Sequence, residues 1–108
     1  MASYLFIESL DPFDSNDSGR YWEMASGLAQ AGNTVTVLLV QNGVLAARSG
    51  ARVDGLATLS QAGVEVLAED FSLRERGIGA DRLANGIRAV PLDVVLDHLA
   101  AGRRVLWH

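Results

Sequence analysis

Short apolar runs alternate with polar, glycine-containing links along the chain. The clearest run, residues 34–40, is rich in β-branched side chains and apolar on both faces, which is typical of a central strand in a parallel sheet. Shorter runs of the same kind at residues 4–7, 64–68 and 103–107 also predict strands. We therefore expect four strands, with residues 34–40 at or near the centre of the sheet.

The first link predicts a polar loop over residues 10–19 and then a helix. Asp17 or Ser18 can cap this helix, and Gly32 is well placed to end it. Apolar residues at helical spacing would form the face that packs on the sheet. These residues are Tyr21, Met24, Ala25, Leu28 and Ala29.

Further helices are expected in the remaining links. Residues 44–48 and 56–62 predict two short helices, the second of which ends at Gly63. A last helix is expected to begin at Pro91, since proline is tolerated in the first turn, and to end at Gly102. Its core face would be formed by Val94, Val95, Leu96 and Leu99.

This alternation of strands and helices predicts one α/β domain over residues 1–108. We expect three layers, with a mostly parallel sheet between helices, as in flavodoxin-like and Rossmann-like folds. In such folds, ligands bind beyond the carboxyl ends of the strands. The links over residues 9–19, 41–43 and 69–72 should therefore form a strand-end pocket. Its candidate residues are Ser9, Asn42, Gly43, Asp70, Arg76 and Gly77.

The composition narrows the chemistry. The 108 residues contain no cysteine and all nine cationic side chains are arginines, which excludes thiol nucleophiles, disulfides, Schiff bases and a Walker lysine in this chain. The net charge of -4 argues against nucleic acid as a direct partner. No apolar run approaches the roughly 20 residues that span a membrane. The first residues also lack the basic segment of a signal peptide, so we expect a cytoplasmic protein without a membrane partner.

Motifs around the third strand suggest different kinds of chemistry. Ser72-Leu-Arg-Glu75 has the form of a capping box, in which Ser72 caps a short helix and Glu75 reaches back to it. Glu69 and Asp70 are adjacent acids that could do acid–base work but are expected to interact with the start of this helix. A Ser72–His98 dyad has less support, because His98 is expected to face solvent.

The loop of residues 14–19 begins like a calcium-binding loop, but its twelfth position is Ala25, where a bidentate glutamate is needed. The same loop precedes a helix and could hold the phosphate of FMN, although Asp11, Asp14 and Asp17 would repel it. A polar loop with a helix cap is the favoured interpretation. Neither a metal nor a cofactor is expected.

Three segments together resemble the DsrE/DsrF/DsrH family, which includes the TusB, TusC and TusD subunits of the sulfur relay for tRNA 2-thiolation. The segments are LLVQNGVLAA at residues 38–47, VEVLAEDFSLRERGI at residues 64–78 and RVLW at residues 104–107. The resemblance implies a compact α/β domain that assembles as a trimer or hexamer. It also implies that active members carry sulfur as a persulfide on a cysteine between the third strand and an arginine-glycine pair.

Matching that pair to Arg76-Gly77 places the family's cysteine position on Ser72 and a second, less regular one on Glu69. A serine cannot form a persulfide, and TusB-like members also lack this cysteine. We therefore expect a non-catalytic, oligomer-forming subunit linked to sulfur transfer, either as a homo-oligomer or beside a cysteine-bearing paralogue. The alternatives are a small-ligand or anion-binding domain that uses the strand-end pocket, and a catalyst based on Ser72, Glu69 or Asp70.

A parallel α/β domain of this size is too small for its helices to cover both faces and all edges of the sheet. Apolar surface should therefore remain for association. The two tryptophans, Trp22 and Trp107, are candidate interface anchors, although burial in the core is the commoner fate of a tryptophan.

Overall fold

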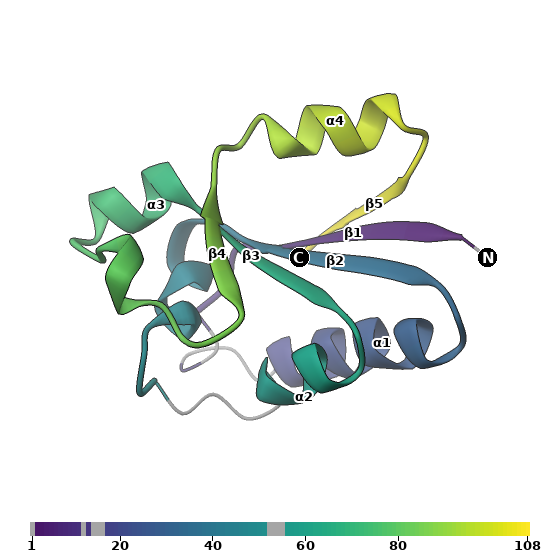
Figure 1. Cartoon of the computed structure of the whole chain (residues 1–108), viewed down its shortest axis with the longest axis horizontal. Coiled ribbons are helices and arrows are strands. Elements are labelled where there is room, and N and C mark those ends of the chain that lie inside the picture. The colour runs from purple at the N-terminus through teal and green to yellow at the C-terminus, as the bar shows by residue number, and fades with distance from the viewer. Residues whose placement is uncertain (1, 12, 14–16, 52–55) are drawn as a thin grey trace.

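Five parallel strands form one sheet in the computed structural model, which describes residues 2–11, 13, 17–51 and 56–108 (Figure 1). The strand order is β4-β3-β2-β1-β5, so β2 lies at the centre, as predicted. The strands are β1 (Ser3–Glu8), β2 (Thr34–Leu39), β3 (Glu65–Glu69), β4 (Ile87–Val90) and β5 (Arg104–Trp107). The helices are α1 (Ser18–Gln30), α2 (Leu56–Gln61), α3 (Asp70–Glu75), α4 (Val94–Ala100) and the 3-10 helices η1 (Gln41–Ala47) and η2 (Ala80–Arg82).

The connections between strands place helices on both faces of the sheet (Figure 1). Strands β1 to β4 follow one another across the sheet, and α1 and α2 in the first two connections lie together on one face. The last connection returns from β4 at one edge to β5 at the other, and α4 lies on the opposite face. The predicted three-layer α/β architecture is therefore confirmed.

Alternate side chains of the strands enter separate cores, because successive residues of a strand point to opposite faces. Phe6 of β1 enters the larger core under α1 and α2, where Trp22 and Leu59 are also buried. Its neighbours Leu5 and Ile7 enter the smaller core under α4. That core also contains Leu38, Val40 and Leu67, with Val94 and Val95 of α4 packed against it.

The buried face of α1 includes a tryptophan that the sequence pattern left out. Tyr21 and Ala25 are buried as predicted, but Met24 is 47% exposed and Trp22 is only 2% exposed. An indole buries a large apolar area, so placing it against the core is favoured over burying the methionine. Trp22 therefore belongs to the core, whereas Trp107 of β5 is 64% exposed and stays a candidate interface anchor.

A strand that the sequence did not predict, β4, immediately precedes Pro91. It pairs with β3 at the edge of the sheet, where Arg88 lies 3.3 Å from Glu65 in an ion pair. The segment is short and contains a charged side chain, so its pattern carries little strand signal without the partner strand. Because β4 runs to Val90, the last helix begins at Val94 and not at Pro91.

The side of α4 that faces the sheet differs from the predicted one. Val95 packs on the smaller core as predicted, but Leu96 and Leu99 are 64% and 53% exposed. His98, predicted to face solvent, is buried, and its Nδ1 accepts a hydrogen bond from Arg103 Nη1 at 3.1 Å. Burial, and then the positive charge of Arg103, lower the pKa of His98, which favours the neutral ring that can accept this bond.

Some sequence predictions concern the loop before α1. Asp14 and Asn16, its first candidate calcium ligands, lie outside the described residues. Asp17, one of the two caps predicted, occupies the N-cap position of α1, but its side chain makes no capping hydrogen bond to the helix. In the part of the chain that the structure describes, none of the helices has the length and apolar character to span a bilayer. Within the same part, no three histidine or carboxylate side chains are grouped so that they could hold a metal ion.

Candidate functional site

The carboxyl end of β3 leads directly into α3, and Glu69 at this junction is the N-cap residue of the helix. Its side chain is nearly fully buried and turns back over the first turn. Glu69 Oε2 accepts a hydrogen bond from Phe71 N at 2.6 Å, and Oε1 accepts one from Ser72 N at 3.0 Å. The first N–H groups of a helix have no partner within it, so this carboxylate satisfies two of them.

Ser72 joins α3 to the segment that follows β2. Its hydroxyl donates to Glu69 Oε1 at 2.6 Å and accepts from Gln41 N at 2.8 Å. The residue is 4% exposed, so this hydroxyl is fixed in the interior. Gln41 has φ of +50°, a left-handed conformation that costs a non-glycine residue about 1 kcal/mol. The hydrogen bond to Ser72 helps to hold it there.

Asn42 and Arg76 connect the same two segments a second time. Asn42 Oδ1 accepts hydrogen bonds from Arg76 Nε at 3.1 Å and Nη2 at 2.9 Å, and Arg76 Nη1 donates to the backbone oxygen of Ser72 at 3.2 Å. The structure thus brings four predicted site residues together at the ends of β2 and β3. We call Gln41, Asn42, Glu69, Ser72 and Arg76 the strand-end cluster.

Three other predicted pocket residues lie beside this cluster in the chain. Gly43 packs so closely on β1 that a Cβ there would be 2.2 Å from a backbone oxygen of that strand. Gly77 follows α3 with φ of +66° and lines a cleft of about 200 Å³ together with Arg48 and Arg82. Asp70 is half-buried in the first turn of α3.

Ser9 belongs to a separate polar group at the ends of β1 and β5. Its N and Oγ both donate to His108 O, at 2.8 and 2.9 Å. Glu8, the residue before it, is fully buried. Glu8 Oε1 accepts a hydrogen bond from Leu10 N at 2.9 Å, and Oε2 lies 2.8 Å from His108 Nδ1. These contacts fasten the end of β5 to the end of β1.

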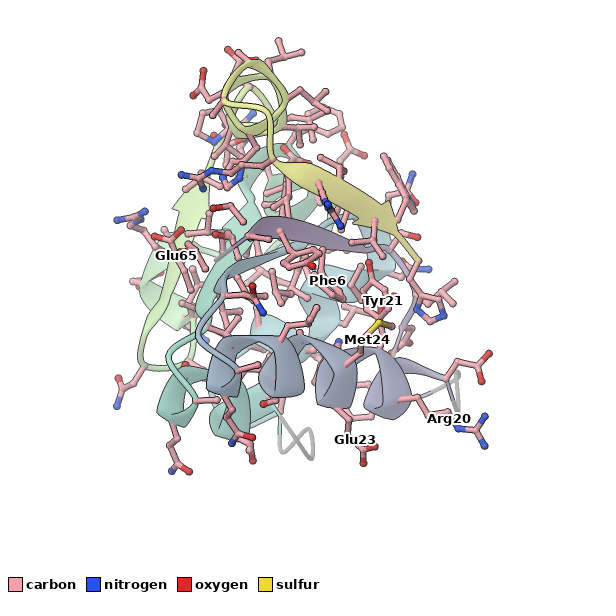
Figure 2. All side chains as sticks on the ribbon, turned by 90° about the vertical axis from the view of Figure 1, so that its right-hand side faces the viewer. Phe6, Arg20, Tyr21, Glu23, Met24 and Glu65 are labelled. Carbon is pink, nitrogen blue, oxygen red and sulfur yellow. The ribbon has the colours of Figure 1, made fainter. Side chains whose placement is uncertain are left out.

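Tyr21 completes this second group from α1 (Figure 2). Its ring stacks on the His108 ring at a centroid distance of 4.7 Å, and its hydroxyl donates to a backbone oxygen of β5 at 2.6 Å. Burial, and then the negative charge of Glu8, raise the pKa of the Tyr21 phenol. Tyr21 therefore stays protonated and acts as a hydrogen-bond donor.

The predicted capping box is wrong. Ser72 is the third residue of α3 and not its cap, and Glu75 is exposed. Because β3 extends to Glu69 and the helix begins at Asp70, the Glu69 carboxylate reaches the N–H groups of the first turn. The expectation that an acid at this strand end interacts with the helix start is confirmed for Glu69.

The environment of Glu69 limits what the Ser72–Glu69 pair can do chemically. Burial alone would raise the pKa of Glu69, but hydrogen bonds from the Ser72 hydroxyl and from the N–H groups of Phe71 and Ser72 outweigh it, and the pKa is lowered. A carboxylate with a lowered pKa is a weaker general base than an ordinary one. The Ser72 oxygen is also engaged by Gln41 N. We conclude that the Ser72–Glu69 pair holds α3 to the segment after β2 and does not activate the Ser72 hydroxyl as a nucleophile.

Acidification is expected to reveal the contribution of Glu69 to stability. Its folded-state pKa is lowered, so the stabilisation is present above the unfolded-state pKa and is lost as the pH falls through the folded-state pKa. Glu69→Gln cannot titrate and should be less stable than wild type near neutral pH, with a difference that shrinks in acid. Urea denaturation of both proteins between about pH 7 and about pH 3 measures this difference.

Glu75→Gln is the matched control, because Glu75 is an exposed acid on the same helix. Its stability difference from wild type should be small at every pH. A Glu69→Gln difference that stays constant over the whole range would contradict the role of the Glu69 charge.

The fold and this junction define the chain as a parallel α/β domain with a buried acid–serine pair at the end of a central strand. A model of the DsrH-like protein family matches residues 12–102, and the chain therefore belongs to that family. The family predicted from the sequence is confirmed, and this member has no cysteine.

Solved structures share the fold. The crystal structure of the ychN protein from E. coli matches with a TM-score of 0.85 over 100% of both chains, at 19% sequence identity. A protein of unknown function from Methanobacterium thermoautotrophicum matches with a TM-score of 0.77 over 100% of both chains, at 18% identity. A third, from Bacteroides thetaiotaomicron, has a TM-score of 0.77 at 18% identity and covers 98% of this chain and 94% of its own. No curated protein matches the chain in sequence.

Sequence reasoning placed Gln41 in a strand-end link without giving it a role, and it missed Glu8 and His108. Gln41 acts through its backbone N–H, so its side chain gives no signal. Glu8 is a fully buried acid that directly follows the apolar run of β1. An acidic residue at the end of a buried apolar strand can be recognised in the sequence as a candidate site residue, because a buried carboxylate needs hydrogen-bond partners.

Proposed function

We propose that this chain is a non-catalytic, oligomer-forming subunit of the DsrH-like family, linked to intracellular sulfur transfer. The observation that carries the proposal is the state of Ser72, which stands where active relatives are expected to carry their cysteine. Its hydroxyl is buried and bonded to Glu69 and Gln41. The position therefore contributes to the packing of the strand-end cluster, and a serine there cannot carry a persulfide.

Apolar side chains on the surface support association with other subunits. Leu96 and Leu99 of α4 are 64% and 53% exposed, and Leu92 in the turn before α4 is 52% exposed. Phe71 of α3 and Trp107 of β5 are also more than half exposed. Clustered exposed apolar surface is typical of protein interfaces. A closed trimer uses one kind of interface, and a hexamer built from two trimers uses a second kind.

At micromolar concentration, the wild-type protein is expected to be a trimer or hexamer by native mass spectrometry and light scattering. Leu96→Arg places a charge in the middle of the α4 leucines and is expected to shift the protein toward smaller species, because a buried unpaired charge is unfavourable. Met24→Arg is the matched control, since Met24 is 47% exposed on α1, across the sheet from α4.

Each possible outcome tests a different part of this proposal. An assembly that survives Leu96→Arg would exclude the α4 leucines as the interface. A monomeric wild-type protein would contradict the homo-oligomer and leave the cysteine-bearing paralogue as the partner. Co-purification from the native cell tests that second form of the proposal.

A second candidate function is anion binding beside the strand ends. Arg48 and Arg82 line the cleft of about 200 Å³ that contains Gly77. Two arginines in the lining of one cleft favour a phosphate, sulfate or carboxylate group. This function would use part of the predicted strand-end pocket and needs no thiol.

A further inference from the structure

Helix α4 buries a histidine against the sheet and leaves leucines in solvent. Val94 and Val95 pack on the smaller core, and His98, one turn further along the same side of the helix, is only 6% exposed. Leu96 and Leu99 are both more than half exposed. The docking of α4 on the sheet therefore depends on a titratable side chain as well as on two valines.

The ring of His98 has to be neutral when α4 is docked. Its Nδ1 lies 3.1 Å from Arg103 Nη1. A guanidinium group has N–H donors and no acceptor, so Nδ1 accepts this hydrogen bond with its lone pair. A second hydrogen bond, from Arg103 N to the backbone oxygen of His98 at 3.0 Å, keeps the arginine beside the ring. Protonation of Nδ1 would place two donors and two positive charges in contact at a buried position.

The other charged groups around His98 come from α4 and from three strands. Asp97 on α4 and Glu65 at the start of β3 both favour a protonated ring. Glu65 is also paired with Arg88 of β4 at 3.3 Å. The Arg104 guanidinium of β5 lies over an aromatic ring of β1 on the other face of the sheet. The residues that β1 and β2 turn toward α4 are not titratable.

The balance of these effects disfavours protonation in the docked helix. Burial, and then the charge of Arg103, outweigh the two carboxylates, so the pKa of His98 is lowered. In a released helix the ring would have the ordinary histidine pKa of about 6.5 and would bind a proton more readily. The stabilisation of the docked helix is therefore complete above about pH 6.5 and is lost as the pH falls through the lowered pKa.

We propose that His98 is an acid-sensitive switch of α4 docking, in which the neutral ring fixes the helix on the sheet and protonation releases it. Release of α4 also displaces the surface formed by Leu96 and Leu99. Acid should therefore weaken an assembly that uses this surface. This second part rests on the proposed function, whereas the docking of α4 does not.

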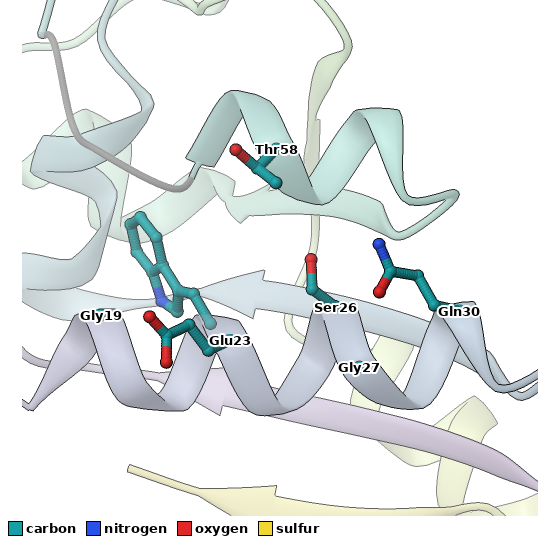
Figure 3. A pocket seen from close by; sticks show the side chains of 7 residues that line it. Gly19, Glu23, Ser26, Gly27, Gln30 and Thr58 are labelled. Atoms are coloured by element: carbon teal, nitrogen blue, oxygen red, sulfur yellow. The ribbon is translucent and has the colours of Figure 1, made fainter.

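Native-state hydrogen exchange followed by NMR measures the release directly. From about pH 7 to about pH 5.5, the protection of the α4 amides, corrected for the intrinsic exchange rate, is expected to fall several-fold and at most about tenfold, the limit for one proton over this range. The α1 amides are the internal control. Helix α1 lies on the other face of the sheet, beside α2 and the cleft of about 460 Å³ that the two helices line (Figure 3).

The chain has two histidines, so one variant of each separates their effects. His98→Gln cannot titrate, and its amide oxygen can accept the hydrogen bond from Arg103, so its α4 protection should stay constant over the same pH range. His108→Gln is the matched control, because His108 stacks on Tyr21 of α1 and not on α4. It should lose α4 protection as the wild-type protein does, and it assigns the His98 ring signals, which should titrate at a lower pH than free imidazole.

Three results would each overturn the inference. They are unchanged α4 protection in the wild-type protein, a His98 ring that titrates like free imidazole, and the same loss of protection in His98→Gln as in wild type. Light scattering over the same pH range measures association separately. An assembly that persists while α4 protection falls would contradict the second part of the inference. A monomeric wild-type protein would contradict the proposed function and leave the exchange test of α4 intact.

Discussion

Gly43→Ala is expected to destabilise the protein by about 3 kcal/mol, at the upper end of the usual cost of overpacking. The added Cβ would lie 2.2 Å from the backbone oxygen of Glu8 and 3.1 Å from its carbonyl carbon. The same oxygen accepts a hydrogen bond from Val40 N at 3.0 Å, so neither β1 nor the start of η1 can move without breaking this contact. Urea denaturation of the variant and the wild-type protein measures the loss.

Gly27→Ala is the matched control for this prediction. Its Cβ would meet no atom of the described residues within 4 Å, and it replaces glycine by the best helix former inside α1. We expect this variant to be more stable than wild type by about 0.5–1 kcal/mol, so the same substitution should have opposite effects at the two positions. A stability of Gly43→Ala within about 0.5 kcal/mol of wild type would show that η1 and β1 separate more easily than their packing indicates.

Sulfur acceptance is expected to be absent in the wild-type protein and to appear, slowly, in Ser72→Cys, because residue 72 is only 4% exposed. A serine hydroxyl cannot form a persulfide, whereas a thiolate at the same position can attack a persulfide donor. The Glu69 carboxylate, 2.6 Å from the present hydroxyl, should raise the pKa of the new thiol and slow the reaction. Adding Glu69→Gln should therefore increase the rate by about tenfold at neutral pH, which corresponds to about one pKa unit. Intact-mass spectrometry after incubation with the donor measures the adduct.

Ser60→Cys provides the matched background, because Ser60 is an exposed residue of α2. Its cysteine should react at an ordinary rate, and Glu69→Gln should not change that rate. A sulfur adduct on the cysteine-free wild-type protein would refute the argument from chemistry. An equal rate for Ser72→Cys with and without Glu69→Gln would refute the electrostatic part of the argument.

The sequence by itself determined the central strand, the class of fold and the family. The run that forms β2 is apolar on both faces, and only a strand covered on both sides of a sheet buries such a run completely, so its central position followed from local pattern. The family followed from short motifs in the right order, and the model of the DsrH-like family bears it out. The missing cysteine follows from the composition and restricts the chemistry without any structure.

Tertiary structure decided the features that depend on a partner segment. β4 has a weak pattern of its own and is stabilised by its pairing with β3. The helix that follows it begins only at Val94, and Leu96 and Leu99, which its pattern assigned to the core, are exposed. The burial of Trp22 could be identified only after α1 had been placed on the sheet.

The strand-end cluster shows the physical reason most clearly. The Ser72 hydroxyl pairs with Gln41 N, a group 31 residues away in the chain, and Arg76 pairs with Asn42 across 34 residues. Local spacing predicts how one helix or strand distributes its own side chains between core and solvent. It holds no information on which buried polar group will meet which, because that meeting is fixed by the order and register of the strands that bring the two segments together.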